Sequence, residues 1–232
     1  MESLKYFDCK LSDLKLDMNE IYLLMGYGMQ TPNQEILDII NDMVSDLNIS
    51  CTPRCGYILR KGEIVDKEHV KVGDTILNPG KIITHAMKEA DYYAIFTATA
   101  GSGFEDYCIK LKEEDDMVKN FIADALGSVI AESTVTWLMN KLEIDAASRG
   151  MKISNNYSPG YCDWLLIDQP KLFSIFPENI SGITLTDSCL MLPVKSVSGI
   201  VAVGKDVKKR PYGCDICKMV TCVKNKKKQS IS

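Results

Sequence analysis

Three cysteines near the C-terminus have the spacing of a metal-binding motif. Cys214, Cys217 and Cys222 form a C-x2-C-x4-C pattern in the stretch YGCDICKMVTC. Two thiolates separated by two residues can bind one metal ion, and nearby lysines favour the thiolate form. Tetrahedral zinc needs a fourth ligand, for which Cys162 and Cys189 are candidates, whereas an iron–sulfur cluster can leave one iron open. The pattern predicts zinc or an iron–sulfur cluster; the alternative is inert thiols in a disordered tail.

The ten-residue stretch NNYSPGYCDW combines turn-forming and aromatic residues. Pro159 and Gly160 force a sharp corner, and the proline holds Ser158 extended. The exposed backbone of such a corner can approach a ligand closely, while Tyr157 and Tyr161 offer ring faces and hydroxyl groups. The stretch is therefore either a binding corner or a structural turn whose tyrosines pack inward.

A second polar stretch, LTDSCLMLPVKSVSG, runs from Leu185 to Gly199. It places serine and threonine hydroxyl groups and a proline between strand-like segments. These hydroxyl groups either cap turns or line a polar pocket.

The motifs of several common enzyme classes are absent. The chain has no GxxxxGK[ST], GxSxG or HExxH motif, and its paired glycines lack the strand–GxGxxG–helix order of dinucleotide sites. It has only two histidines. We expect His69, in a charged stretch, to be exposed and His85 to be a packed or surface residue. No motif places a histidine to activate Cys162 as a nucleophile, so a self-sufficient hydrolase is not expected.

The composition is that of a globular protein. Of the 232 residues, 46% are apolar and 25% are charged, which permits a substantial core. We find no run of about 18 apolar residues that would span a membrane, and no secretory signal in the N-terminal stretch. We therefore expect a cytoplasmic protein whose nine cysteines are not structural disulfides.

The net charge of −4 is unevenly distributed. Residues 205–232 carry +7, which leaves −11 on the rest of the chain. The acidic body argues against nucleic-acid binding, whereas the tail either binds a phosphate or an acidic partner or is simply solvated. We expect an α+β domain over residues 1–204 and a basic, cysteine-containing tail over residues 205–232.

Two segments have clear helical periodicity. In TPNQEILDIINDMVSDLNIS, Thr31 is the expected cap and Pro32 suits the first turn, and apolar residues follow at helical spacing. The longest helix is expected from about Met117 to Ser148, with Gly150 ending it. Its expected apolar face comprises Met117, Phe121, Ala125, Val129, Ile130, Trp137, Leu138 and Leu142.

The remaining segments predict short elements. NEIYLLMGYG, GKIITHAMKEA and DQPKLFSIFP read as short helices, CGYILRKGEIV as a hairpin or bent strand, and DYYAIFTATAG, GITLT and VSGIVAVG as strands. Helices segregated from mainly antiparallel strands indicate an α+β fold, a twisted sheet with flanking helices.

Taken together, the two polar stretches resemble the activation domain of cobalamin-dependent methionine synthase. That domain has an xPGY corner, followed some forty residues later by LT[DE]SxxMxPxxSVSG. The resemblance is specific over about residues 150–204, and EIYLLMGYG and the cysteine tail look like features of free-standing relatives of the domain. The matching positions are Ser158, Pro159, Gly160 and Tyr161, then Leu185, Thr186, Asp187, Ser188, Met191, Pro193, Ser196, Val197, Ser198 and Gly199.

The resemblance implies a domain that binds S-adenosylmethionine and docks over a cobalamin. In the synthase the cobalamin occasionally oxidises to inactive Co(II), and its one-electron reduction to Co(I) is uphill. Each ~59 mV of unfavourable potential lowers the Co(I) population about tenfold. Methylation by S-adenosylmethionine drains that population, so the domain acts by holding methyl donor and cobalt in line.

The resemblance also implies which residues contact the ligand. The corner, Ser158-Pro159-Gly160, would hold S-adenosylmethionine together with Ser196 and Ser198 on the later strand. Tyr161 would face both the ligand and the corrin.

One position departs from the family. Where the synthase has an arginine that can pair bidentately with the ligand carboxylate, this chain has Asn156, which offers only neutral hydrogen bonds. Weaker binding, a changed ligand preference and loss of S-adenosylmethionine binding all remain open.

The chain lacks the DxHxxG motif of cobalamin-binding modules, so the cobalamin must be held by a partner. We therefore expect an accessory subunit, not active alone, that reactivates a cobalamin-dependent methionine synthase or a related corrinoid methyltransferase with the help of an electron donor. A cluster on the tail cysteines could relay the electron. The alternative is a metal- or iron–sulfur-binding redox or interaction module that keeps the fold without binding S-adenosylmethionine.

Overall fold

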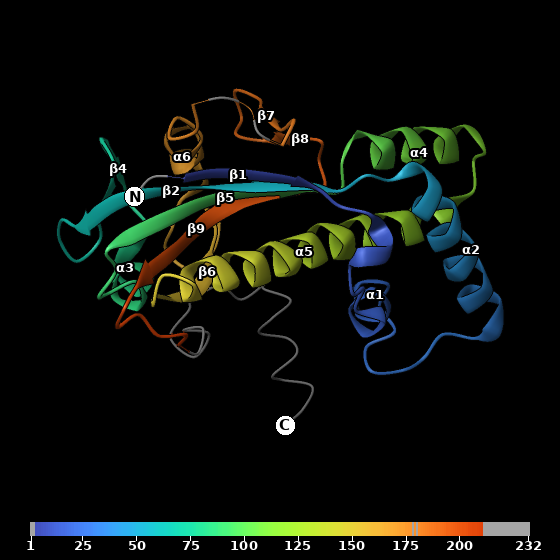
Figure 1. Ribbon diagram of the computed structural model, residues 1–232. Helices are drawn as coiled ribbons and strands as arrows, with labels where there is room; N and C mark the ends of the chain where they lie inside the picture. Colours follow the sequence, from blue (N-terminus) through green and yellow to red (C-terminus); the bar gives the residue numbers. More distant parts are fainter. Residues whose placement is uncertain (1–2, 178, 180, 211–232) are drawn as a thin grey trace.

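The computed structural model describes residues 3–177, 179 and 181–210, and its centre is a seven-stranded sheet (Figure 1). The strands follow the order β4-β3-β2-β5-β9-β6, with β1 also paired to β2, and every pairing is antiparallel. A separate two-stranded sheet pairs β7 with β8. The bounds are β1 Ser3–Asp8, β2 Arg54–Ile64, β3 Val70–Val72, β4 Thr75–Leu77, β5 Tyr92–Thr99, β6 Lys152–Tyr157, β7 Thr184–Leu185, β8 Met191–Leu192 and β9 Ser196–Gly204.

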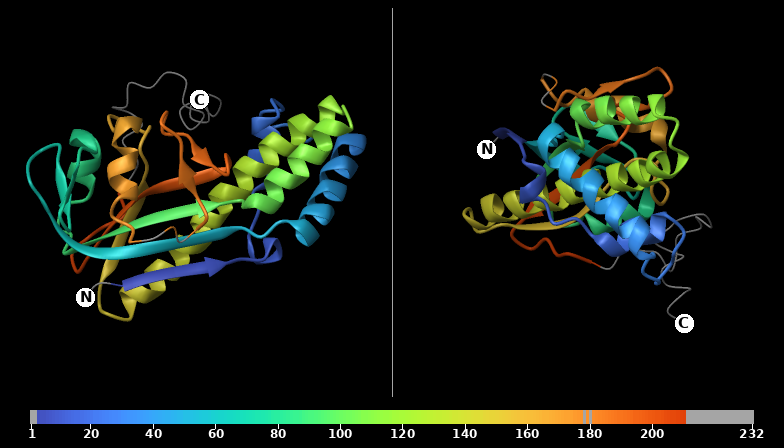
Figure 2. Two further views of the ribbon diagram at one scale, coloured as in Figure 1. Left: turned by 90° about the horizontal axis from the view of Figure 1, so that it is seen from above. Right: turned by 90° about the vertical axis from the view of Figure 1, so that its right-hand side faces the viewer.

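Helices cover both faces of the large sheet. In Figures 1 and 2, α5 runs along one side of the sheet. Helices α1, α2 and α4 gather around the N-terminal half of α5, at the opposite end of the molecule from α3. The helices are α1 Met18–Leu24, α2 Gln34–Ser50, α3 Gly80–Ala86, α4 Ser102–Glu113, α5 Met117–Ala147 and α6 Gln169–Phe173, with short 3-10 helices η1 Leu11–Asp13 and η2 Leu166–Asp168. The mainly antiparallel sheet with flanking helices confirms the predicted α+β class.

Alternation along the strands builds a separate hydrophobic core on each face of the sheet. Phe96 and Val201 belong to the core under α5, whereas their neighbours Ile95 and Ile200 belong to the core with Trp164. Successive strand residues point to opposite faces, so near-continuous apolar runs such as those of β5 and β9 are required when both faces are covered.

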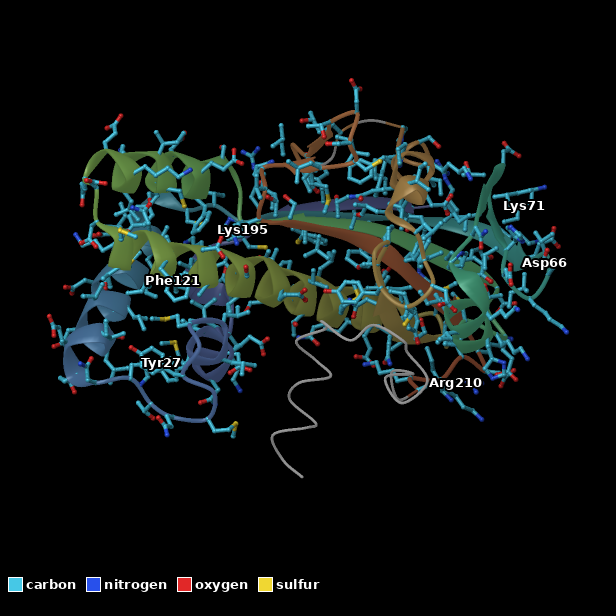
Figure 3. All side chains as sticks on the ribbon, turned by 180° about the vertical axis from the view of Figure 1, so that it is seen from behind. Tyr27, Asp66, Lys71, Phe121, Lys195 and Arg210 are labelled. Carbon is cyan, nitrogen blue, oxygen red and sulfur yellow. The ribbon has the colours of Figure 1, made fainter. Side chains whose placement is uncertain are left out.

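The buried face of α5 agrees with the predicted one at Ala125, Val129, Ile130, Leu138 and Leu142 but not at the start of the helix. Met117 and Phe121 are 83% and 55% exposed, and the burial begins at Ile122. In the first turns of this helix apolar residues occur on several sides, so their spacing does not decide between Phe121 and Ile122. Phe121 instead borders a groove of about 410 Å³ together with Tyr27 of the α1–α2 connection (Figure 3).

By length and composition α5 could cross a membrane, but 67% of its most apolar window is buried within the fold. The helix begins at the predicted residue, with the Asp116 carboxylate accepting a hydrogen bond from the Lys119 amide. Because most of this window is buried, α5 is the central helix of the core.

Helix α2 begins two residues later than a Thr31 cap implies. Asn33 is the cap, and its side-chain oxygen accepts a hydrogen bond from the Ile36 amide at 3.1 Å. The predicted apolar face of α2 is confirmed at Ile40, Met43 and Leu47, which are buried in the core.

The C-terminal end of α5 is tied to the sheet by Asp145. Its carboxylate accepts hydrogen bonds from Lys5 Nζ at 2.7 Å and Tyr57 Oη at 3.0 Å and pairs with Arg149 at 3.3 Å. Burial alone raises the pKa of Asp145, but the donors of Lys5 and Tyr57 outweigh it and hold this pKa below its usual value. The contact fixes α5 against β1 and β2.

Candidate ligand-binding cleft

The predicted corner follows directly after β6. Gly160 has φ +94°, a left-handed conformation that glycine adopts without strain. The Gly160 amide donates to the Trp164 carbonyl at 2.8 Å, and the Tyr161 amide donates to the Ser158 carbonyl at 3.2 Å. Ser158 is buried whereas Tyr161 is exposed, so the chain turns outward here. The corner is a closed loop with its own backbone hydrogen bonds.

The buried carboxylate of Asp168 holds the C-terminal end of this loop in place through hydrogen bonds. Asp168 Oδ2 accepts hydrogen bonds from Trp164 Nε1 at 3.0 Å and from the Asn78 amide at 2.7 Å, and Oδ1 pairs with Lys171 Nζ at 2.9 Å. Burial acts to raise the pKa of Asp168, but these donors outweigh it and lower the pKa overall. The ionised carboxylate therefore holds Trp164, and through Trp164 the corner.

The corner forms one side of a cleft of about 970 Å³, which α5 and the segment leading into α1 complete. Ligand sites commonly have volumes of about 300–1,000 Å³. Three carboxylates line the cleft, those of Asp17, Glu20 and Glu132, with the hydroxyl groups of Ser128, Ser133 and Thr136. Leu16, Leu24 and Val129 add apolar surface, and Gly160 and Tyr161 come from the corner. The cleft is thus acidic, with hydroxyl groups on one wall.

Two hydrogen-bonded contacts hold the cleft walls in place. The Ser133 hydroxyl on α5 donates to the Lys15 carbonyl at 3.1 Å, which joins the two walls. Asp17 caps α1, accepting from the Asn19 and Glu20 amides at 3.0 and 3.3 Å. The Asp17 carboxylate is therefore preorganised.

The predicted corner residues divide between the cleft and the interior behind it. Gly160 and Tyr161 line the cleft, while Ser158 and Pro159 are buried next to them. Asn156 lies in β6, where it pairs with Val201 of β9, and it is not among the residues that line the cleft.

Ser196 and Ser198 do not line this cleft either. Ser196 Oγ lies 2.8 Å from Thr99 Oγ1 and 2.5 Å from the Pro193 carbonyl, which closes the turn into β9. Ser198 is buried and accepts a hydrogen bond from Gln169 Nε2 at 3.3 Å. Both hydroxyl groups thus have structural partners, and their contact with a ligand stays a prediction.

The hydroxyl group of Thr186 caps a turn. It accepts a hydrogen bond from the Leu190 amide and contacts Ser188 Oγ, both at 3.0 Å. For the stretch from Leu185 to Gly199 the sequence left turn capping and pocket lining as alternatives, and Thr186 and Ser188 take part in turn capping.

The predicted metal ligands Cys214, Cys217 and Cys222 lie outside the described residues. Within residues 3–177, 179 and 181–210, no three His, Cys, Asp or Glu side chains group as metal ligands would. Cys162 and Cys189 form no disulfide. Zinc or an iron–sulfur cluster therefore has no support from the described part of the chain.

Sequence reasoning missed the acidic wall of the cleft. Its local signal is weak, a single carboxylate, Glu132, among apolar and hydroxyl-bearing residues in SVIAESTVTWLM. Glu132 and Asp17 line the same cleft because α1 packs against α5.

Comparisons with known proteins agree with the fold. A family model described as "Vitamin B12 dependent methionine synthase, activation domain" matches residues 81–218, more than half of the chain. The structure is also similar to a crystal structure of the MetH reactivation domain bound to AdoHcy, with a TM-score of 0.67 and 14% sequence identity over 90% of this chain and 81% of that one. This second likeness shows the fold, and the family match shows the membership. The chain therefore belongs to the family of the activation domain of vitamin B12-dependent methionine synthase.

Proposed function

We propose that the acidic cleft binds S-adenosylmethionine and that the protein is an accessory subunit for reductive reactivation of a cobalamin-dependent methionine synthase or a related corrinoid methyltransferase. One observation carries the proposal: the Gly160–Tyr161 corner and the carboxylate-bearing wall of α5 line the same cleft. The neighbour solved with AdoHcy supports it, since AdoHcy is the demethylated form of this ligand.

The chemistry of the cleft fits S-adenosylmethionine. The ligand carries two positive groups, a sulfonium and an ammonium, for which Asp17, Glu20 and Glu132 supply negative charge. Ser128 and Thr136 can hydrogen-bond the ribose hydroxyl groups. The ring of Tyr161 offers a face on which the adenine can stack. When bound, S-adenosylmethionine would supply the methyl group, and these residues would hold and orient it.

An exposed apolar rim next to the corner suits a docking partner. Leu165, Leu166 and Ile167 are consecutive exposed residues that follow Trp164. A Cβ atom placed on Gly160 would lie 4.0 Å from Leu166 Cδ1, so the rim directly adjoins the corner. Contiguous exposed apolar side chains often mark interaction sites. We infer that this rim contacts the corrin-carrying partner, with Tyr161 between ligand and corrin.

The histidines fit a chain that does not hold the cobalamin itself. His69 Nδ1 contacts the Asp66 carboxylate at 2.9 Å, His85 is exposed on α3, and neither lines the cleft. The chain would then contribute by positioning the methyl donor over a cobalt held by the partner, while a separate donor supplies the electron.

Calorimetric titration with S-adenosylmethionine tests the proposal. We expect saturable binding, weakened several-fold by Tyr161→Phe and by Pro159→Ala, because the first removes a hydroxyl group from the cleft and the second loosens the corner. Tyr6→Phe is the matched control, since Tyr6 is an exposed tyrosine on β1 that does not line the cleft.

Absence of any binding heat would overturn the proposal. It would favour the redox or interaction module that keeps the fold without the ligand. The absorption spectrum and zinc content of anaerobically purified protein then decide that alternative, because a colourless, zinc-free sample excludes both metal centres.

A further inference from the structure

We propose that Lys15 is the binding group for the carboxylate of the ligand's amino-acid moiety. This inference rests on the proposed function and adds a specificity determinant to it. Lys15 lies outside the residues matched by the family model, in the segment that leads into α1.

The charges in the cleft single out Lys15. Among the described residues that line the cleft it is the one cation, alongside the three carboxylates of Asp17, Glu20 and Glu132. S-adenosylmethionine has two cationic groups and one carboxylate. A cleft with carboxylates alone would repel that carboxylate, so one positive side chain completes the complementarity.

The backbone at Lys15 is held firmly while its side chain is exposed. The Lys15 carbonyl accepts the hydrogen bond from Ser133, and Leu14 just before it is buried in the core. The Lys15 ammonium forms no ion pair with another described residue, whereas Asp17 two residues on is fixed by its capping hydrogen bonds. A long, flexible lysine on an anchored backbone can reach a ligand group without moving the wall.

Two other described cations near the site are already paired. Lys171 pairs with Asp168 at 2.9 Å. Lys195, which lies beside α5 (Figure 3), donates to Ser128 Oγ at 2.9 Å but pairs with Asp124 at 2.7 Å. Asn156 is neutral and does not line the cleft. Among the described residues that line the cleft, Lys15 is therefore the cation whose charge is available for an incoming carboxylate.

The test compares two ligands that differ only in the carboxylate. We expect Lys15→Met to weaken binding of S-adenosylmethionine about tenfold, equivalent to about 1.4 kcal/mol. Binding of decarboxylated S-adenosylmethionine should change less than about twofold, since that ligand has nothing to pair with Lys15. Lys15→Arg keeps the charge and should keep most of the affinity for S-adenosylmethionine.

Lys10→Met is the matched control. Lys10 is an exposed lysine five residues earlier that does not line the cleft, so this change alters the net charge equally and should leave both affinities unchanged. Thermal unfolding followed by circular dichroism verifies that each variant is folded.

The possible outcomes separate the two proposals. If the parent protein binds neither ligand, the proposed function fails and this inference fails with it. If the parent binds S-adenosylmethionine but Lys15→Met binds it equally well, only the role of Lys15 is refuted. An equal loss for both ligands also refutes it, because the effect would then not act through the carboxylate.

Discussion

Replacing Asp168 by alanine should destabilise the protein and loosen the binding corner together. The carboxylate is only 6% exposed and accepts hydrogen bonds from Trp164 Nε1 and the Asn78 amide. Water can reach the exposed Asn78, but Trp164 is buried and its indole N–H would be left without an acceptor. Leaving this buried N–H group without an acceptor and losing the charge-assisted hydrogen bonds should lower the unfolding free energy by about 2–3 kcal/mol. For a domain of this size that lowers Tm by about 5–10 °C.

Urea denaturation at a series of pH values measures the effect and its electrostatic origin. The donors lower the pKa of Asp168 in the folded protein below its unfolded value of about 3.9. A lowered folded pKa adds stability above the unfolded pKa, and this stability is lost as the pH falls through the folded pKa. The gap in unfolding free energy between the parent and Asp168→Ala should therefore be full at pH 7 and shrink from about pH 5 downward.

Asp163→Ala serves as the control, since Asp163 is an exposed aspartate in the same loop. It should change the unfolding free energy by less than about 0.5 kcal/mol. The reasoning is refuted if Asp168→Ala is equally mild at pH 7, or if its gap from the parent stays constant down to pH 3. Calorimetry should also show weaker ligand binding by Asp168→Ala, because the Trp164 carbonyl accepts the hydrogen bond from Gly160.

Two further substitutions separate packing from partner docking. A Cβ atom on Gly199 would lie 2.2 Å from the Tyr157 carbonyl oxygen, so Gly199→Ala must displace β6. The substitution should lower the unfolding free energy, measured by urea denaturation, by about 3 kcal/mol. An unchanged denaturation midpoint would contradict this. Ile167→Glu places a charge on the exposed apolar rim and should slow S-adenosylmethionine-dependent methylation of the corrinoid partner, followed by its visible spectrum, while the ligand Kd of the isolated protein stays within about twofold. An unaffected methylation rate would remove the rim from the docking surface.

Local signals in the sequence were sufficient for much of the fold. The stripe of α2, the run of β5 and the Pro159–Gly160 corner each depend on residues close together in the chain, so their patterns predict them. The buried face of α5 was predicted from Ala125 onward, but in its first turns apolar residues on several sides make Phe121 and Ile122 equally good candidates for burial. Only packing against the sheet selects Ile122.

Contacts between distant segments explain the features that the sequence did not reveal. Strand β6 contains two adjacent asparagines, which disfavour strands, yet Asn156 pairs with β9, so tertiary context overrides propensity. The cleft is lined by Lys15, Glu132 and Tyr161, and no spacing rule links positions so far apart. The corner was predictable, whereas the acidic wall facing it was not.

The position of β9 has a consequence for how the protein forms. This strand, the last among the described residues, inserts between β5 and β6, and it pairs along its length with β5, from Tyr92–Val203 to Thr99–Ser196. Until residue 204 has left the ribosome, β5 lacks one of its two neighbours and β6 has none within the sheet. Pairing between such distant segments is slow because a long loop must close first. Completion of the sheet, and of the corner that β6 leads into, must therefore await nearly the whole domain, and we expect its unfinished chains to depend on protection from aggregation during synthesis.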